Sequence, residues 1–147
     1  MFKHILMLVD GTEFSERAID TGVRFAKSVG ARITGFIAEP EYKIPTHGEI
    51  VSHTAVSMYE HAEKASAHAK AALARIAERA TAEGVEFTTD YTESDRPVDA
   101  IVDAADKHAC DLIVMASHGR RGLDRLLHGS AAAGVMSHTR IPVLVLH

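Results

Sequence analysis

The sequence is poor in cysteine and aromatic residues, and it has no long apolar run. Cys110 is its only cysteine among 147 residues, which excludes an internal disulfide. Tryptophan is absent, aromatic residues make up 5% of the chain and the formal net charge is −4, so neither base-stacking surfaces nor a basic face for nucleic acid is predicted. The sequence contains no stretch of about 20 apolar residues, which is the length needed to span a membrane. Asp10 interrupts the first apolar run too early for a secretory signal, so we expect a cytoplasmic protein without membrane partners.

Apolar runs alternate with helical spacing along the whole chain. Strands are predicted at 4–9, 31–38, 85–92, 111–115 and 141–146; the first of these is a short apolar run of the kind that buried parallel strands form. Helices are predicted over about 12–30, 53–83, 95–108 and 130–138. Gly30 and Gly84 would end the first two helices, and Ser94 or Asp95 would cap the third. This alternation predicts one α/β domain over residues 1–147, with a doubly wound five-stranded parallel sheet of order 3-2-1-4-5 and helices on both faces.

A basic stretch with spaced glycines, MASHGRRGLDRLLHGS, follows the fourth predicted strand at residues 115–130. Small residues allow the backbone to approach a ligand closely, and the free N–H groups of a helix starting near Ser130 favour an anion. On spacing alone, turn glycines and a capping serine explain the stretch equally well. The sequence has no G-x4-G-K-[ST] motif and no G-x-G-x-x-G after the first strand, which excludes the common phosphate and dinucleotide motifs.

Asp10 ends the first predicted strand, at the edge of the sheet where the winding reverses. Doubly wound folds bind ligands at this edge, and a carboxylate there accepts hydrogen bonds from ribose hydroxyls. An aspartate before Gly11 is also common in simple turns. Because strands one and four are predicted neighbours, Asp10 would face the basic stretch across one crevice, with sugar at one end and phosphate at the other.

Over essentially its whole length the chain resembles the universal stress protein family. The resemblance is carried by ILMLVDGTEFSERAI near the start, by the long middle helix and by MASHGRRGLDRLLHGSAAAGVMSHTRIPVLVLH at the end. The ATP-binding branch of the family has G-x2-G-x9-G-[ST] after the fourth strand. The sequence matches this pattern at Gly119, Gly129 and Ser130, and has Ala116 in place of the first glycine.

The resemblance implies a stress-response signalling module that binds ATP or a related adenine nucleotide, with or without Mg²⁺. Asp10 would bind the ribose, and the backbone of Ile37 would meet the adenine edge. The rest of the implied site consists of Leu8, Met115 and Ala116 around the nucleoside and Gly119, Gly129, Ser130 and the amide of Ala131 at the phosphates. The apolar strand at 141–146 would form a sheet edge, and both this edge and the resemblance predict a homodimer through it.

Two alternative functions remain open. Ala116 is compatible with a protein of the same fold that binds no nucleotide and acts through protein contacts alone. A weak ATPase is the second alternative, but the sequence shows no nucleophile with a base and neither an S-G-G-x-D-S nor an H-x-G-H element, so no catalytic residue is assigned. Residues 39–52 include two prolines and a glycine and are expected to form a mobile flap beside the cleft.

The remaining polar and sulfur side chains favour structural roles. His61 and His68 are seven residues apart, so they share one helix face about 10 Å apart, too far for one metal ion. We expect these two histidines, together with His47 and His53, to be solvated, and predict no metal site. Cys110 precedes an apolar run and is expected to be buried and structural.

Overall fold

The computed structural model describes residues 1–10, 13–41, 43, 51–116 and 131–146. Strands and helices alternate as predicted, and each boundary lies within two residues of its expected position. The elements are β1 (His4–Leu8), α1 (Glu13–Val29), β2 (Arg32–Glu39), α2 (Val51–Glu83), β3 (Phe87–Glu93), α3 (Pro97–Lys107), β4 (Leu112–Ala116), α5 (Ala131–His138) and β5 (Val143–Leu146).

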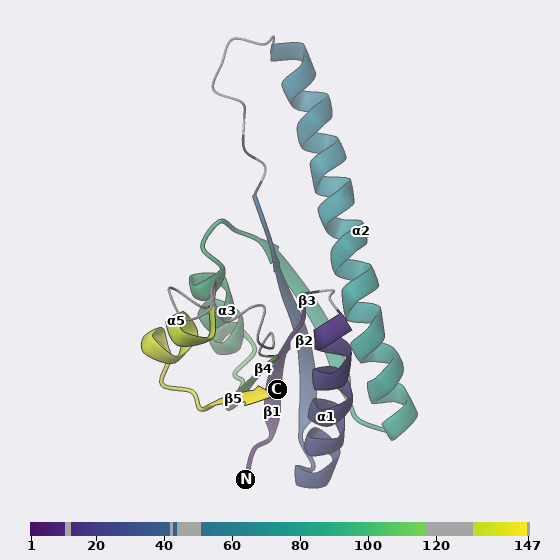
Figure 1. The fold of residues 1–147 in the computed structure, drawn as a ribbon, viewed down its shortest axis with the longest axis vertical. Coiled ribbons are helices and arrows are strands. Elements are labelled where there is room, and N and C mark those ends of the chain that lie inside the picture. Colours follow the sequence, from purple (N-terminus) through teal and green to yellow (C-terminus); the bar gives the residue numbers. More distant parts are fainter. Residues whose placement is uncertain (11–12, 42, 44–50, 117–130, 147) are drawn as a thin grey trace.

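The five strands form a parallel sheet in the order β3-β2-β1-β4-β5, which confirms the predicted topology. Helices α1 and α2 cover one face of this sheet, and α3 and α5 cover the other (Figure 1). Alternate residues of a strand point to opposite faces. Ile5 of β1 therefore packs under α1 and α2, whereas Leu6 packs under α3 and α5. Burial of both faces explains the continuous apolar runs of the central strand β1 and of β4.

Three helices end in the same backbone arrangement, but only two of them use glycine. Gly30 and Gly84 have φ values of 68° and 70°, which confirms their predicted role in ending α1 and α2. At the end of α3 the Cys110 N–H donates to the carbonyl of Ala105 in the same way, yet Ala109 occupies the left-handed position with φ 50°. This alanine therefore carries backbone strain that a glycine would avoid.

The start of α3 differs from the expected cap. Arg96 occupies the N-cap position without a side-chain hydrogen bond, and the Ser94 hydroxyl instead accepts a hydrogen bond from the Arg96 N–H. Neither Ser94 nor Asp95 caps the helix, because Pro97 begins it and so moves the N-cap position past both residues.

Cys110 is 6% exposed, and burial raises the pKa of its thiol to about 11. The thiol therefore stays protonated and unreactive near neutral pH, as expected for a structural cysteine.

Within the described part of the chain, no helix has the length and apolar character needed to cross a bilayer.

Candidate functional site

The carboxyl ends of β1, β2 and β4 lie next to one another at one edge of the sheet. Leu8 pairs with Phe36 on β2, and Met7 pairs with Val114 on β4. Because the strands are parallel, the residues that follow these pairs emerge at the same edge, where doubly wound folds bind ligands. The sequence-predicted site residues that the strands bring to this edge are Leu8, Asp10, Ile37, Met115 and Ala116.

Ile37 and Met115 contribute to this edge mainly through their backbones. The side chain of Ile37 is 3% exposed and packs in the core under α1 and α2. The side chain of Met115 is 6% exposed and packs in the opposite core, under α3 and α5. Leu8, Asp10 and Ala116 are half-buried and lie closer to the surface of the edge.

Strand β2 extends past the point where β1 stops pairing with it. The last pair between them is Leu8 with Phe36, followed by a hydrogen bond of 3.1 Å from the Val9 N–H to the Phe36 carbonyl. The next three residues of β2, 37–39, continue to pair with β3 on the other side. The backbone groups of residues 37–39 on the side facing β1 are therefore not paired with that strand. They lie near the end of β1 that leads to Asp10, and a ligand at this edge could hydrogen-bond to them.

Ala116 has ordinary strand geometry. It is the last residue of β4 and pairs with Leu146 of β5. Among non-glycine residues in the described part of the chain, only Ala109 has a positive φ. An alanine at position 116 therefore carries no left-handed strain, and replacing the family's glycine costs no backbone energy here.

The phosphate end of the predicted site is described only from Ala131 onward, because Gly119, Gly129 and Ser130 lie outside the described residues. Ala131 is the first residue of α5 and packs against the core on that face. Helix α5 rests closely on α3: a Cβ added at Gly134 would lie 2.6 Å from Cγ2 of Val98. The position of the α5 amino terminus therefore depends on this contact.

Two histidines of α2 contact the end of β2, which the sequence did not predict, although the side chain of His68 is 52% exposed, in line with the expected solvation. Nε2 of His61 lies 3.0 Å from the carbonyl oxygen of Pro40, and Nδ1 of His68 lies 2.5 Å from Oε1 of Glu39. These contacts were not predicted because they depend on β2 extending to Glu39, which brings residues 39 and 40 next to α2. Glu39 thus belongs to a strand and not to the predicted flap, of which residues 42 and 44–50 lie outside the described residues.

The prediction of no metal site also concerns His47 and His53. His47 and the side chain of His53 are outside the part of the chain that the structure describes. Across the described ranges, no three histidine, cysteine or carboxylate side chains are grouped so that they could hold a metal ion.

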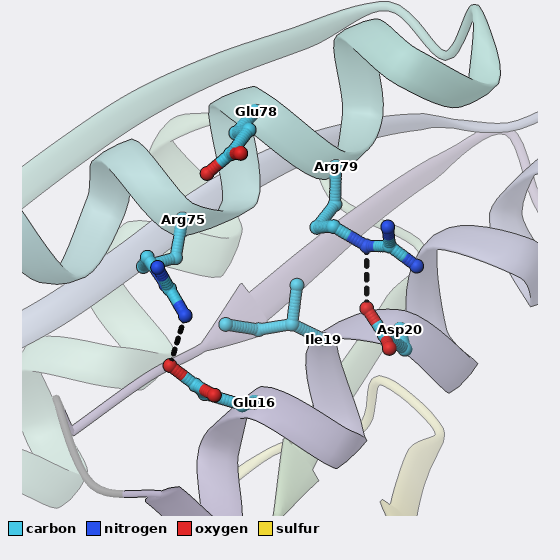
Figure 2. A pocket seen from close by; sticks show the side chains of 6 residues that line it. All are labelled: Glu16, Ile19, Asp20, Arg75, Glu78 and Arg79. Atoms are coloured by element: carbon cyan, nitrogen blue, oxygen red, sulfur yellow. Dashed lines mark hydrogen bonds and ion pairs between the residues drawn. The ribbon is translucent and has the colours of Figure 1, made fainter.

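A hollow of about 280 Å³ between α1 and α2 contains charged side chains that pair with one another (Figure 2). Arg75 of α2 pairs with Glu16 of α1, and Nε of Arg79 lies 2.5 Å from Oδ1 of Asp20. Figure 2 shows Ile19 between the two pairs. Since both arginines are neutralised by acids of the facing helix, we assign this cluster to helix packing and not to ligand binding.

Sequence reasoning missed a polar ladder at the opposite, amino-terminal end of the sheet. Nε2 of buried His4 lies 2.7 Å from the Thr34 hydroxyl, which lies 2.9 Å from the Thr88 hydroxyl. Burial, followed by the charge of Arg32, lowers the pKa of His4. The ladder links β1, β2 and β3, and only the pairing of strands brings its members together.

Asp90 lies beside this ladder and joins β3 to the end of α3. Its Oδ2 accepts hydrogen bonds from Nζ of Lys107 at 2.8 Å and Nε2 of His108 at 2.7 Å. Burial acts to raise the pKa of Asp90, but these hydrogen bonds outweigh it, so the pKa lies below its usual range.

Comparisons with known proteins agree on one family. The profile of the universal stress protein family matches residues 1–147. A universal stress protein of Methanocaldococcus jannaschii is 30% identical, with the match covering 99% of this chain and 82% of that protein. A solved universal stress protein in complex with cAMP is 25% identical with a TM-score of 0.72, over 99% of this chain and 97% of the other. A universal stress protein of Archaeoglobus fulgidus in complex with dAMP, 20% identical, shares the fold with a TM-score of 0.62, over 99% and 98% of the two chains.

Proposed function

Because the chain belongs to the universal stress protein family, we propose that it binds an adenine nucleotide, ATP foremost, at the carboxyl edge of β1, β2 and β4. One observation carries this proposal. Asp10, which follows β1, and residues 37–39, which extend β2 past its last pair with β1, lie at the same edge of the sheet. The cAMP complex of a relative supports a ligand of the same class. Nucleotide binding would serve a stress-response signalling module by changing the surface offered to protein partners.

Each site residue has a distinct role in this proposal. The Asp10 carboxylate accepts hydrogen bonds from the ribose hydroxyls, and the backbone of Ile37 meets the adenine edge. Leu8, Met115 and Ala116 line the nucleoside pocket, and Gly119, Gly129, Ser130 and the amide of Ala131 hold the phosphates. The free N–H groups at the start of α5 suit an anion. Asp10 alone is a weak magnesium ligand, so Mg²⁺ would arrive with the ATP phosphates and meet Asp10 through water.

The geometry of Ala116 favours nucleotide binding over the nucleotide-free alternative. That alternative depends on the alanine closing a site that needs a glycine. Ala116 lies in a regular strand pair, and its φ is not positive. The alanine therefore adds one methyl group without distorting the backbone. No catalytic residue is proposed.

Mass spectrometry of nucleotide released from the purified protein, followed by calorimetry with ATP, tests the proposal. We expect the natural protein to bind ATP, and Asp10→Ala and Gly129→Val to lose most of this affinity. Asp103→Ala removes an exposed carboxylate from the middle of α3 and is the matched control, which should bind normally. Absence of ATP binding by the natural protein, or equal binding by Asp10→Ala and the control, would contradict the proposal.

A further inference from the structure

The end of β2 is held from α2 by two histidines. His68 contacts the side chain of Glu39 through Nδ1 at 2.5 Å, and His61 contacts the backbone carbonyl of Pro40 through Nε2 at 3.0 Å. Both acceptors require an N–H on the imidazole, so each contact specifies a donor nitrogen. On the side of β3, the Ser94 N–H donates to the Glu39 carbonyl at 2.7 Å. The strand end is therefore tied to a helix and to its neighbouring strand.

The Glu39–His68 contact is the stronger constraint because Glu39 is buried. The side chain of Glu39 is 7% exposed, whereas that of His68 is 52% exposed. A carboxylate removed from water needs a hydrogen-bonding partner, and a charge-assisted hydrogen bond is stronger than a neutral one. Loss of His68 would leave this carboxylate without the donor, so it would turn toward water and shift the strand end that carries it.

Glu39 lies in the part of β2 that extends beyond β1. Residues 37–39 pair with β3 but lie past the last pair with β1, so β1 does not fix their position. Helix α2 provides the missing support: it runs past the sheet toward its amino terminus (Figure 1), and His61 and His68, nearer the middle of the helix, contact residues 40 and 39. The backbone edge assigned above to adenine is thus positioned by α2 rather than by β1.

We propose that the Glu39–His68 pair and the His61–Pro40 contact form a latch that positions the β2 end and thereby determines selectivity for the nucleotide base. This inference rests on the proposed function, because it takes base recognition to occur through the backbone of Ile37 in this strand end. Adenine and guanine present different donors and acceptors along their edges, and a site with hydrogen-bonding groups in fixed positions rejects the mismatched base. His61 and His68 are positioning residues in this account and do not contact the nucleotide.

The test compares His68→Ala, which removes the donor, with His68→Gln, whose amide N–H can still donate to Glu39. Ala67→Gln is the matched control, because it places the same side chain at the neighbouring exposed position of α2. Calorimetry gives the Kd for ATP and for GTP, and hydrogen exchange reports the protection of the peptide covering residues 37–41. Thermal melting of each variant measures any loss of stability separately.

We expect His68→Ala to bind ATP about tenfold more weakly, equivalent to about 1.4 kcal/mol. GTP affinity should change little, so the preference for ATP over GTP falls, and exchange at 37–41 becomes faster. His68→Gln should restore both properties, and Ala67→Gln should match the natural protein. A lower melting temperature with an unchanged ATP to GTP ratio would overturn the latch and leave only a structural role. If the natural protein binds neither nucleotide, the proposed function and base selectivity both fail, whereas unchanged exchange in His68→Ala refutes the latch by itself.

Discussion

The contact between Gly134 of α5 and Val98 of α3 predicts that Gly134→Ala destabilises the protein, although alanine is the better helix former. A Cβ at position 134 would lie 2.6 Å from Cγ2 of Val98 and 3.5 Å from its Cγ1. Ordinary van der Waals contacts begin at about 3.4 Å, so the helices must separate by most of an ångström. Val98 cannot easily turn away, because a β-branched side chain in a helix has one strongly preferred rotamer.

Two opposing terms determine the size of this effect. Replacing glycine by alanine inside a helix stabilises it by about 1 kcal/mol. Overpacking a filled contact costs about 1–3 kcal/mol. Because the clash involves a stiff side chain, we expect the overpacking cost to exceed the gain in helix propensity. The free energy of unfolding should then fall by about 1 kcal/mol. The same displacement moves the amino terminus of α5, so ATP affinity should fall as well.

A double-mutant cycle with Val98→Ala measures this effect. Val98→Ala removes both methyl groups that meet the new Cβ, so Gly134→Ala should be harmless or stabilising in its presence. Urea unfolding of the four proteins should give a coupling energy of about 1–2 kcal/mol in favour of the double variant. Stabilisation by Gly134→Ala alone, as helix propensity dictates, or additive effects of the two changes would refute the reasoning.

Further predictions concern five individual positions. Ala116→Gly should change the Kd for ATP by no more than about twofold, equivalent to about 0.4 kcal/mol, because Ala116 has no positive φ; calorimetry showing a tenfold gain would contradict this. Ala109→Gly should raise the free energy of unfolding by about 1 kcal/mol by relieving the left-handed alanine, and a decrease in urea titrations would be inconsistent with strain. The pKa of His4 lies below 6.5 in the folded state, so its contribution to stability is complete above pH 6.5 and is lost as the pH falls below that value. The pKa of Asp90 lies below 3.8, so its contribution is complete above pH 3.8 and is lost as the pH falls from there through the lower folded pKa. Urea unfolding measured over a series of pH values should show that the free energy of unfolding of His4→Gln falls less steeply with pH just below 6.5 than that of the natural protein. An equal dependence on pH would argue against the His4 assignment. Val145→Lys should convert the proposed β5 homodimer into a folded monomer, whereas a monomeric mass for the natural protein at micromolar concentration would refute the dimer.

The fold was predictable because each level of the sequence pointed to the same arrangement. Continuous apolar runs such as Leu112–Ala116 indicate strands buried on both faces, and their alternation with helices requires parallel pairing. Gly30 and Gly84 marked two helix ends correctly, since glycine readily adopts the left-handed conformation. The end of α3 carries no such signal at Ala109. There the surrounding fold imposes a conformation that the residue type does not favour.

The contrast between what local sequence signals indicate and what the surrounding fold imposes also explains which parts of the candidate site were predicted. Asp10 and Ile37 were placed correctly at the carboxyl edge because topology alone brings strand ends together. The backbone angle of Ala116 depends on its pairing with Leu146, so the sequence left open whether the alanine was strained. The roles of Gly119, Gly129 and Ser130 remain predictions from the motif.

The latch could not be predicted because its partners share no local pattern. Glu39 followed by Pro40 indicates the end of a strand and the start of a loop, and a histidine among the polar residues of α2 indicates a solvated face. Only the folded chain brings Glu39 and His68 together across 29 positions of sequence, where burial of the carboxylate makes the imidazole necessary. Helix α2 thus has two roles that its periodicity does not distinguish. Its carboxyl-terminal half packs on the sheet through residues such as Ile76, and His61 and His68, nearer the middle of the helix, hold the end of β2.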